Sequence, residues 1–171
     1  YELNGDLIDE IENIGPPNTS SNCRTPSFSS PRIICEVFGN LIKLYEPETE
    51  TWETLPIQGY DPIINGDNVV VTTQDSVAIY NIITQEQQTL SEIHSGTGAL
   101  MKSFWGDNLA AVQGDTISVL NVSSRAIQQL YQTDSVHSLY RVQIHEREVA
   151  FYEVETEYVG LPKVGLWVCT F

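Results

Sequence analysis

The side chains of this sequence that could do chemistry are three histidines, three cysteines and 23 carboxylates. His94, His137 and His145 have neither a cysteine nor a carboxylate at the spacing of metal ligands, so we expect structural or solvated histidines and no bound metal. The sequence holds no nucleophile motif, no glycine-rich phosphate loop and no calcium loop. It therefore predicts no catalytic residue and no cofactor.

The net charge of the chain is strongly negative. The 23 Asp and Glu residues against 8 Lys and Arg give a formal net charge of −15. Nucleic acid and anionic lipid both require a cationic face, so this balance counts against them as partners. No run of 18 or more apolar residues is present, and we expect no membrane insertion. The charge suits a protein partner with a basic or neutral surface, or solubility alone.

The segments that would position these residues repeat along the chain. Residues 40–46, 75–81 and 115–121 each begin with Asn or Asp, alternate apolar side chains and reach a polar residue at the seventh place. The copies are 35 and 40 residues apart, and Gly66-Asp67-Asn68 matches Gly106-Asp107-Asn108 at the same distance of 40. A fixed period of about 20 to 50 residues is typical of stacked structural units.

Each full unit is predicted to contain four short strands. Runs rich in Val, Ile, Thr and aromatic residues indicate strands; they fall at 60–65, 68–73, 76–82 and 86–90, then at 99–105, 108–113, 116–122 and 126–130. Four antiparallel strands in about 40 residues are the size of a β-propeller blade. A small sheet cannot bury both faces, so neighbours must stack on it. We predict an all-β chain of blades at about 32–55, 59–90, 96–130 and 136–171.

Residues 1–31 differ in composition from the rest. Prolines among Ser, Thr and Asn predict a linker or an extended arm, after helix-like spacing over residues 7–14. The first residue is Tyr1, which we interpret as the start of a processed or excised chain. Asn18-Thr19-Ser20 and Asn121-Val122-Ser123 fit the glycosylation pattern, and the compartment stays open.

One predicted hairpin resembles a known repeat. Residues 44–56, Leu-Tyr-Glu-Pro-Glu-Thr-Glu-Thr-Trp-Glu-Thr-Leu-Pro, resemble the outer hairpin of a kelch repeat. The resemblance implies that Tyr45 and Trp52 pack between blades. The glycine doublet of kelch strands and the Trp-Asp ending of WD40 blades are missing. The likeness is to the β-propeller repeat superfamily (kelch-like, F-box-associated or WD40-like blades), with the subfamily open and the first two favoured.

The repeats amount to about three and a half blades, because the fourth stops after its third strand. Known propellers close with about four to eight blades. Either residues 1–31 supply the missing outer strand of a small four-bladed ring, or the chain is a piece of a larger propeller, which we favour. The resemblance to small propellers also suggests that Cys23 or Cys35 bonds to Cys169 and fastens the ends of the ring.

The repeated turns carry acids that could line one rim of the ring and bind a basic peptide or a cation. We favour turn chemistry, since Asp and Asn cap hairpins by bonding their own backbone. The acids are Asp67, Asp75, Asp107 and Asp115. Trp52, Trp105 and Trp167 suit packing between blades better than a platform for sugars.

Three hypotheses for function remain. The first is a non-catalytic module that binds another protein through its rim loops, because propeller rims are rigid frames for variable loops. The second is a secreted propeller that belongs to, or accompanies, a carbohydrate-active enzyme, or that binds glycans. The third is a half-propeller that completes its ring with a second copy or with further blades of the same protein.

Overall fold

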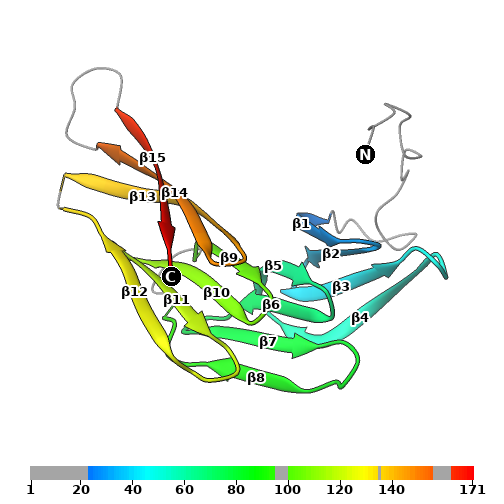
Figure 1. Ribbon diagram of the computed structural model, residues 1–171. Coiled ribbons are helices and arrows are strands. Elements are labelled where there is room, and N and C mark those ends of the chain that lie inside the picture. Colours follow the sequence, from blue (N-terminus) through cyan, green and yellow to red (C-terminus); the bar gives the residue numbers. More distant parts are fainter. Residues whose placement is uncertain (1–22, 95–99, 135, 156–162) are drawn as a thin grey trace, which may run out of the picture.

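The computed structural model describes residues 23–94, 100–134, 136–155 and 163–171, and these form strands and turns without a helix. Fifteen strands make four antiparallel sheets, three of four strands and one of three, and within each sheet the strands follow chain order. The predicted all-β chain of blades is confirmed. The first and fourth sheets lie at the two ends of an open arc (Figure 1). The described part of the chain has no helix long and apolar enough to cross a bilayer.

Each sheet begins with the strand that lies at the inside of the arc. The first sheet consists of β1 (Arg24–Ser29), β2 (Arg32–Val37), β3 (Leu41–Glu46) and β4 (Thr51–Gln58). The second consists of β5 (Tyr60–Asn65), β6 (Asn68–Thr72), β7 (Val77–Asn81) and β8 (Gln87–Leu90). The third consists of β9 (Lys102–Trp105), β10 (Asn108–Gln113), β11 (Thr116–Asn121) and β12 (Ile127–Gln132). The fourth consists of β13 (His137–His145), β14 (Glu148–Glu155) and β15 (Val164–Thr170).

The second and third sheets share one register. Asn68 pairs with Asn81, and Asn108 pairs with Asn121 at the same place 40 residues later. Gly66 and Gly106, in the turns before these strands, have φ values of +57° and +56°, which side chains rarely adopt. This requirement explains why glycine recurs with the repeat. The predicted strand bounds of these two units agree with the structure to within three residues.

The predicted boundary of the N-terminal arm at residue 31 is corrected, because residues 24–29 form β1. This strand is the inner strand of the first sheet and pairs with β2; it adds no outer strand to the fourth. Pro26 lies in a β-bulge next to Thr25, whose φ is +43°, and most of the strand is exposed. A strand is recognised in a sequence by alternating apolar and polar residues. This strand lacks that pattern, because it contains a proline and is mostly exposed. Residues 1–22 lie outside the described residues.

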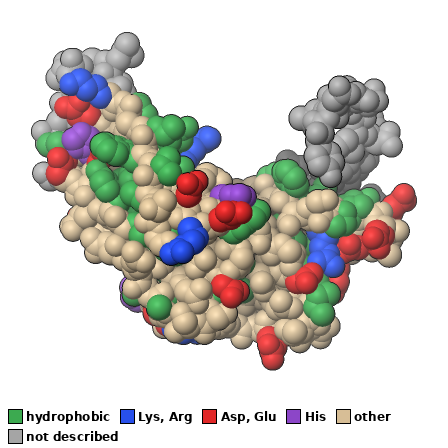
Figure 2. All heavy atoms as spheres, viewed as in Figure 1, with side chains coloured by type: hydrophobic (Ala, Val, Ile, Leu, Met, Phe, Trp, Pro, Cys, Tyr) green, Lys and Arg blue, Asp and Glu red, His purple; other side chains and the backbone are tan. Residues whose placement is uncertain are grey.

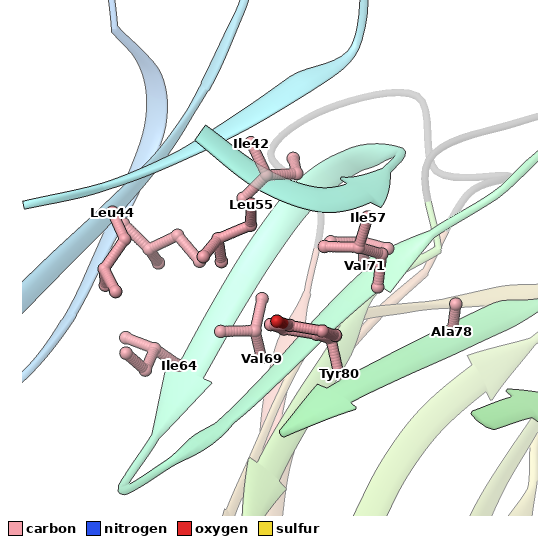
Figure 3. Packing of buried hydrophobic residues seen from close by; sticks show 10 residues of the cluster. Ile42, Leu44, Leu55, Ile57, Ile64, Val69, Val71, Ala78 and Tyr80 are labelled. Atoms are coloured by element: carbon pink, nitrogen blue, oxygen red, sulfur yellow. The ribbon is translucent and has the colours of Figure 1, made fainter. Parts of the chain in front are cut away.

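Apolar side chains pack between neighbouring sheets in three clusters. The first cluster joins the first and second sheets, where Leu44 and Leu55 face Ile64, Val69 and Val71 (Figure 3). The second cluster joins the second and third sheets, and the third joins the third and fourth. Successive strand residues point to opposite faces, so one sheet supplies side chains to two clusters. Each fully buried aliphatic side chain contributes about 1.5–3 kcal/mol, and this packing holds the arc together.

Hydrogen bonds also connect each inner strand to the next. In every case a side-chain oxygen of one inner strand accepts a backbone N–H from the inner strand of the following sheet or from the turn directly after it. The pairs are Ser27 with Ile64 at 3.3 Å, Ser29 with Gly66 at 3.0 Å, Asn65 with Gly106 at 3.3 Å and Ser103 with Ile144 at 3.1 Å.

Candidate binding surfaces

The four repeated acids lie at opposite ends of the sheets. Asp67 and Asp107 occupy turns between the first and second strands of their sheets, whereas Asp75 and Asp115 occupy turns between the second and third. Successive hairpins of an antiparallel sheet turn at alternate ends. The expectation that all four could line one rim is therefore wrong. We call the two ends the Asp67 end and the Asp75 end.

At the Asp67 end the acids bond to neighbouring turns and strands. Asp67 accepts a hydrogen bond from Nη1 of Arg32 at 2.6 Å, and Glu46 accepts one from Nε at 2.8 Å. The two carboxylates, Asp67 first, raise the pKa of Arg32. Asp107 Oδ2 accepts from Ser123 Oγ at 3.1 Å. These carboxylates thus have partners inside the fold.

The Asp75 end contains a hollow of about 530 Å³ between the first and second sheets. Asn40 of the β2–β3 turn, Asp75 of the β6–β7 turn and the connection 58–60 are among its lining residues. A Cβ on Gly59 would lie 2.5 Å from the carbonyl oxygen of Thr72, so only glycine fits at this position of the connection. The floor of the hollow is therefore tightly packed backbone.

An exposed aromatic residue lies in the turn that borders this hollow. Phe38, in the β2–β3 turn two residues before Asn40, is 81% exposed. On the other side, the hydroxyl of Tyr60 donates to the carbonyl oxygen of Thr73 at 2.8 Å, which fixes the ring. The Asp75 end thus carries an exposed aromatic side chain in the β2–β3 turn and a polar hollow that Asn40 of the same turn and Asp75 line.

The inner strands of all four sheets line a second hollow of about 530 Å³ at the inside of the arc. Three of these strands have a β-bulge here, and Thr25, Asp61 and Arg141 have φ values of +43°, +49° and +46° at these bulges. Positive φ is costly for residues with a side chain. The same irregularity at equivalent places shows that the repeat shapes this hollow.

Lys102 is a buried cation that lines the same hollow. Its Nζ donates to the carbonyl oxygen of Asp61 and to Oγ1 of Thr72, both at 2.7 Å. Burial lowers the pKa of Lys102 to about 8, against the opposing effect of the Asp61 carboxylate. The amine thereby connects the inner strand of the third sheet to the second sheet.

The tryptophans take different positions. Trp52 lies 5.1 Å from Tyr45 within the first sheet, so this pair is made inside one sheet. Trp105 lies 4.3 Å from His145 of the next sheet, and Trp167 lies 6.2 Å from Tyr131 of the preceding one. Two of the three rings therefore contact a neighbouring sheet, although each is more than a third exposed.

The cysteines do not join the ends of the arc. Cys35 is buried in the first sheet with the thiol of Cys23 beside it, and Cys169 packs against the cluster between the third and fourth sheets. All three are free thiols. The hypothesis of a bond from Cys23 or Cys35 to Cys169 is therefore contradicted, because Cys35 lies in the first sheet and Cys169 in the fourth, at the two ends of an open arc (Figure 1).

The histidines lie apart from one another. His137 Nδ1 is 2.5 Å from Oδ1 of Asp134, and this contact raises the pKa of His137 and lowers that of Asp134. His145 packs on Trp105, and His94 is exposed. Within the described ranges no three His, Cys, Asp or Glu side chains gather as metal ligands would.

Two asparagines have roles that we did not assign from the sequence. Asn81 and Asn121 end the third strands of their sheets; each amide donates to an asparagine on the neighbouring strand, Asn68 or Asn108, at 2.9 and 3.1 Å. The side-chain oxygen of Asn81 also accepts the N–H groups of Ile83 and Thr84, and that of Asn121 accepts the N–H and the hydroxyl of Ser124. Nδ2 of Asn121 is thus engaged within the sheet, although Asn121 fits the glycosylation pattern. The recurrence of Asn at a distance of 40 was the signal for this role.

Comparisons with known proteins identify the fold. No protein-family model matches the chain, and no curated protein sequence matches it. Among solved structures, the computationally designed Ika4 protein aligns at a TM-score of 0.62 and 16% identity, over 90% of this chain and 94% of that one. BamB from Moraxella catarrhalis aligns at 0.59 and 14% identity, over 85% and 43%. PorZ from Porphyromonas gingivalis aligns at 0.54 and 10% identity, over 90% and 21%.

The chain spans less than half the length of the BamB and PorZ chains that it matches. At these identities the likeness concerns the fold, and these neighbours are propeller-like. The succession of antiparallel sheets of three or four strands and the structural matches agree on one conclusion. The chain has a β-propeller-like fold.

Proposed function

We propose that this chain is a non-catalytic interaction module that binds another protein through the turns at the Asp75 end. The observation that carries the proposal is the exposed Phe38 in the β2–β3 turn, because Asn40 of the same turn lines the hollow together with Asp75. Aromatic anchors beside polar, well-packed surface are typical of protein interfaces. The likeness to PorZ, described as a bacterial surface component of a secretion system, is compatible with a binding role.

The charge of the chain indicates the chemistry of the partner. With a net charge of −15 and a carboxylate in the hollow, the surface favours a partner that is basic or neutral. Complementary charge mainly raises the association rate, and salt screens it. We therefore expect binding to weaken several-fold as the salt concentration rises.

The finer assignment to kelch-like blades is also part of this proposal. The β3–β4 hairpin contains the kelch-like segment, and the rings of Tyr45 and Trp52 pair on the face opposite the first cluster. A blade that preceded the first sheet would cover them, as the kelch resemblance implies.

The proposal is tested with variants at the two ends of the sheets. Affinity capture with the chain as bait is followed by calorimetry with the isolated partner. Phe38→Ser is expected to weaken binding about 30-fold, and Asp75→Asn several-fold, because hot-spot truncations cost at least about 2 kcal/mol. Ile83→Ser is the matched control, since Ile83 is 64% exposed in a turn at the Asp67 end. A partner that binds all three variants equally would refute the placement at the Asp75 end.

A further inference from the structure

The fourth sheet has an apolar face that the described part of the chain leaves open. Tyr140, Tyr152 and Leu166 pair across its three strands in one row. These three residues, with Val164 and Val168, are 41% to 63% exposed. We call these five residues the trailing face. The other side of the sheet packs on the third sheet.

The equivalent positions are buried in the earlier sheets. The strand register makes Val168 the equivalent of Val119 and Ile79, which are 3% and 5% exposed. Tyr152 is likewise the equivalent of Val112, which is 6% exposed. In both cases the cover is the next sheet of the arc. The repeat itself thus indicates that a further sheet of the same kind fits the trailing face.

The first sheet has the complementary open face. Phe28 on β1 is the equivalent of Ile64, Phe104 and Ile144 on the later inner strands. Those three are 5% exposed or less under the preceding sheet, whereas Phe28 is 79% exposed. Ile33 pairs with Phe28 on one side and with Tyr45 on the other. Ile33 and Tyr45 are only half-buried. We call Phe28, Ile33 and Tyr45 the leading face.

The two faces do not cover each other within one chain. They belong to sheets at opposite ends of the arc (Figure 1), and hydrophobic side chains gather on the fourth sheet beside the hollow between the ends (Figure 2). Phe28 and Val168 both line a hollow of about 460 Å³ at the inside of the arc. Phe28 and Val168 are 79% and 60% exposed there, so the described residues of the chain leave both side chains largely uncovered.

We propose that the trailing face of each chain packs on the leading face of a second copy. Two identical junctions related by a two-fold axis then close a ring of eight sheets, twice the four of one chain. Eight is within the range of about four to eight blades in known propellers, and two-fold symmetry is the commonest form of closed assembly. The inference does not depend on the partner surface at the Asp75 end.

The polar groups at the junction match those between the sheets of one chain. Gln143 is the equivalent of Ser27 and Ser103, whose hydroxyls accept an N–H from the next inner strand. In the dimer, the side-chain oxygen of Gln143 accepts the N–H of the partner's Phe28. Ile79 and Phe104 belong to one cluster, so their equivalents Val168 and the partner's Phe28 meet in the same way.

The test is the mass of the 171-residue chain in solution, measured by light scattering over a range of concentrations. We expect twice the chain mass of 19.1 kDa. Val168→Lys places a cation in both junctions and is expected to raise the dissociation constant at least about 100-fold. This variant reduces the negative charge of the chain, so its loss of association cannot come from general repulsion. Ile127→Lys, at a 49% exposed site on β12, is the control and leaves the dimer intact.

A charge-pair variant tests which faces meet. Phe28→Glu alone weakens association as Val168→Lys does, and both sites are exposed, so circular dichroism is expected to show an intact fold. The double variant places a lysine opposite a glutamate at each junction and regains at least about tenfold in affinity over Val168→Lys. Failure to regain affinity overturns the pairing of the two faces. A wild-type chain that stays monomeric at every concentration, or forms open polymers, overturns the ring.

Discussion

Buried charged side chains connect neighbouring sheets of this molecule. Lys102 of the third sheet reaches the second through Asp61 and Thr72. Glu153 of the fourth sheet accepts hydrogen bonds from the hydroxyls of Tyr131, at 2.9 Å, and of Thr133 on the third. Burial, and then Glu153, raise the pKa of Tyr131. A buried ion is tolerated when it is hydrogen-bonded, so these contacts favour one arrangement of the sheets.

The buried Lys102 predicts that stability depends on pH. Its pKa falls from 10.5 to about 8 in the folded chain, so between these values the unfolded chain binds more protons. The free energy of unfolding therefore rises with pH through this window, by about 3 kcal/mol for the full shift. Urea unfolding of the wild type and of Lys102→Met at pH 7.5 and 10.5 measures the difference. Lys43→Met is the control and retains the rise; parallel curves for wild type and Lys102→Met would contradict the prediction.

Removal of Glu153 is expected to destabilise the contact between the third and fourth sheets. Glu153→Ala leaves the hydroxyls of Tyr131 and Thr133 without their acceptor and lowers the free energy of unfolding by about 3 kcal/mol. Tyr131→Phe removes one donor and costs less. Chemical denaturation of both single variants and the double variant gives the coupling energy, for which we expect about 1–2 kcal/mol. Additive losses would show that the pair does not act together.

Cys35 is expected to react more slowly than the other thiols. It is 1% exposed, and burial, followed by the neighbouring Cys23, raises its pKa. Alkylation requires the thiolate and access to it. In the folded chain at pH 8, iodoacetamide should modify Cys23 and Cys169 at least about tenfold faster, as peptide mass spectrometry can show. In urea the three rates should converge, and fast labelling of Cys35 in the native chain would contradict this order.

The four-stranded sheets depend on turns that are specified locally. In the second and third sheets, an asparagine at the end of the third strand organises the outer turn. The fourth sheet has Thr170 at this place, as the shared register shows. The turn residues account for the good agreement of the predicted bounds of the middle sheets. By contrast, β1 was missed because Pro26 and the bulge at Thr25 interrupt its pattern.

The asparagine turns predict a local cost. Asn121→Ala removes the hydrogen bond to Asn108 and the acceptor for the N–H of Ser124, at 3.1 and 2.9 Å. We expect a loss of about 1–2 kcal/mol in the free energy of unfolding. Gln128→Ala, at an exposed site on β12, is the control and changes stability by less than about 0.5 kcal/mol. Thermal denaturation followed by circular dichroism measures both, and equal effects would count against a role for the turn.

At the scale of the whole molecule, apolar packing between the sheets stabilises the fold, whereas repulsion among the excess acids destabilises it. Three apolar clusters hold the four sheets in an arc, while 23 acids and 8 basic residues repel on balance. Partly exposed ion pairs such as Arg125 with Glu92 contribute about 1 kcal/mol each at most. We therefore expect repulsion to be the larger electrostatic effect.

Salt is expected to stabilise the chain. Increasing sodium chloride from about 0.02 to 0.5 M screens repulsion among the acids and raises the free energy of unfolding by about 1 kcal/mol. Urea unfolding at the two concentrations measures the change, and potassium chloride at equal concentrations is the control for a specific ion effect. A lower stability in high salt would show that attractive ion pairs dominate.

The sequence by itself determined the local structure of this protein. Turn glycines and asparagines at a distance of 40 residues, with alternating apolar runs between them, specify hairpins because these preferences act within a few residues. That information predicted an all-β chain of repeated sheets. It did not predict that Asp67 and Asp107 lie at one end of the sheets and Asp75 and Asp115 at the other. That placement depends on how successive hairpins are connected, because they turn at alternate ends of a sheet.

Only the tertiary structure decided which repeated positions are covered. Phe28 and Phe104 occupy the same place in their strands, yet one is 79% and the other 5% exposed. The amine of Lys102 is likewise buried because β5 and β6 of another sheet supply its partners. Burial depends on which sheet lies next in space, and no local pattern contains that neighbour. The open faces at the two ends of the arc are the result.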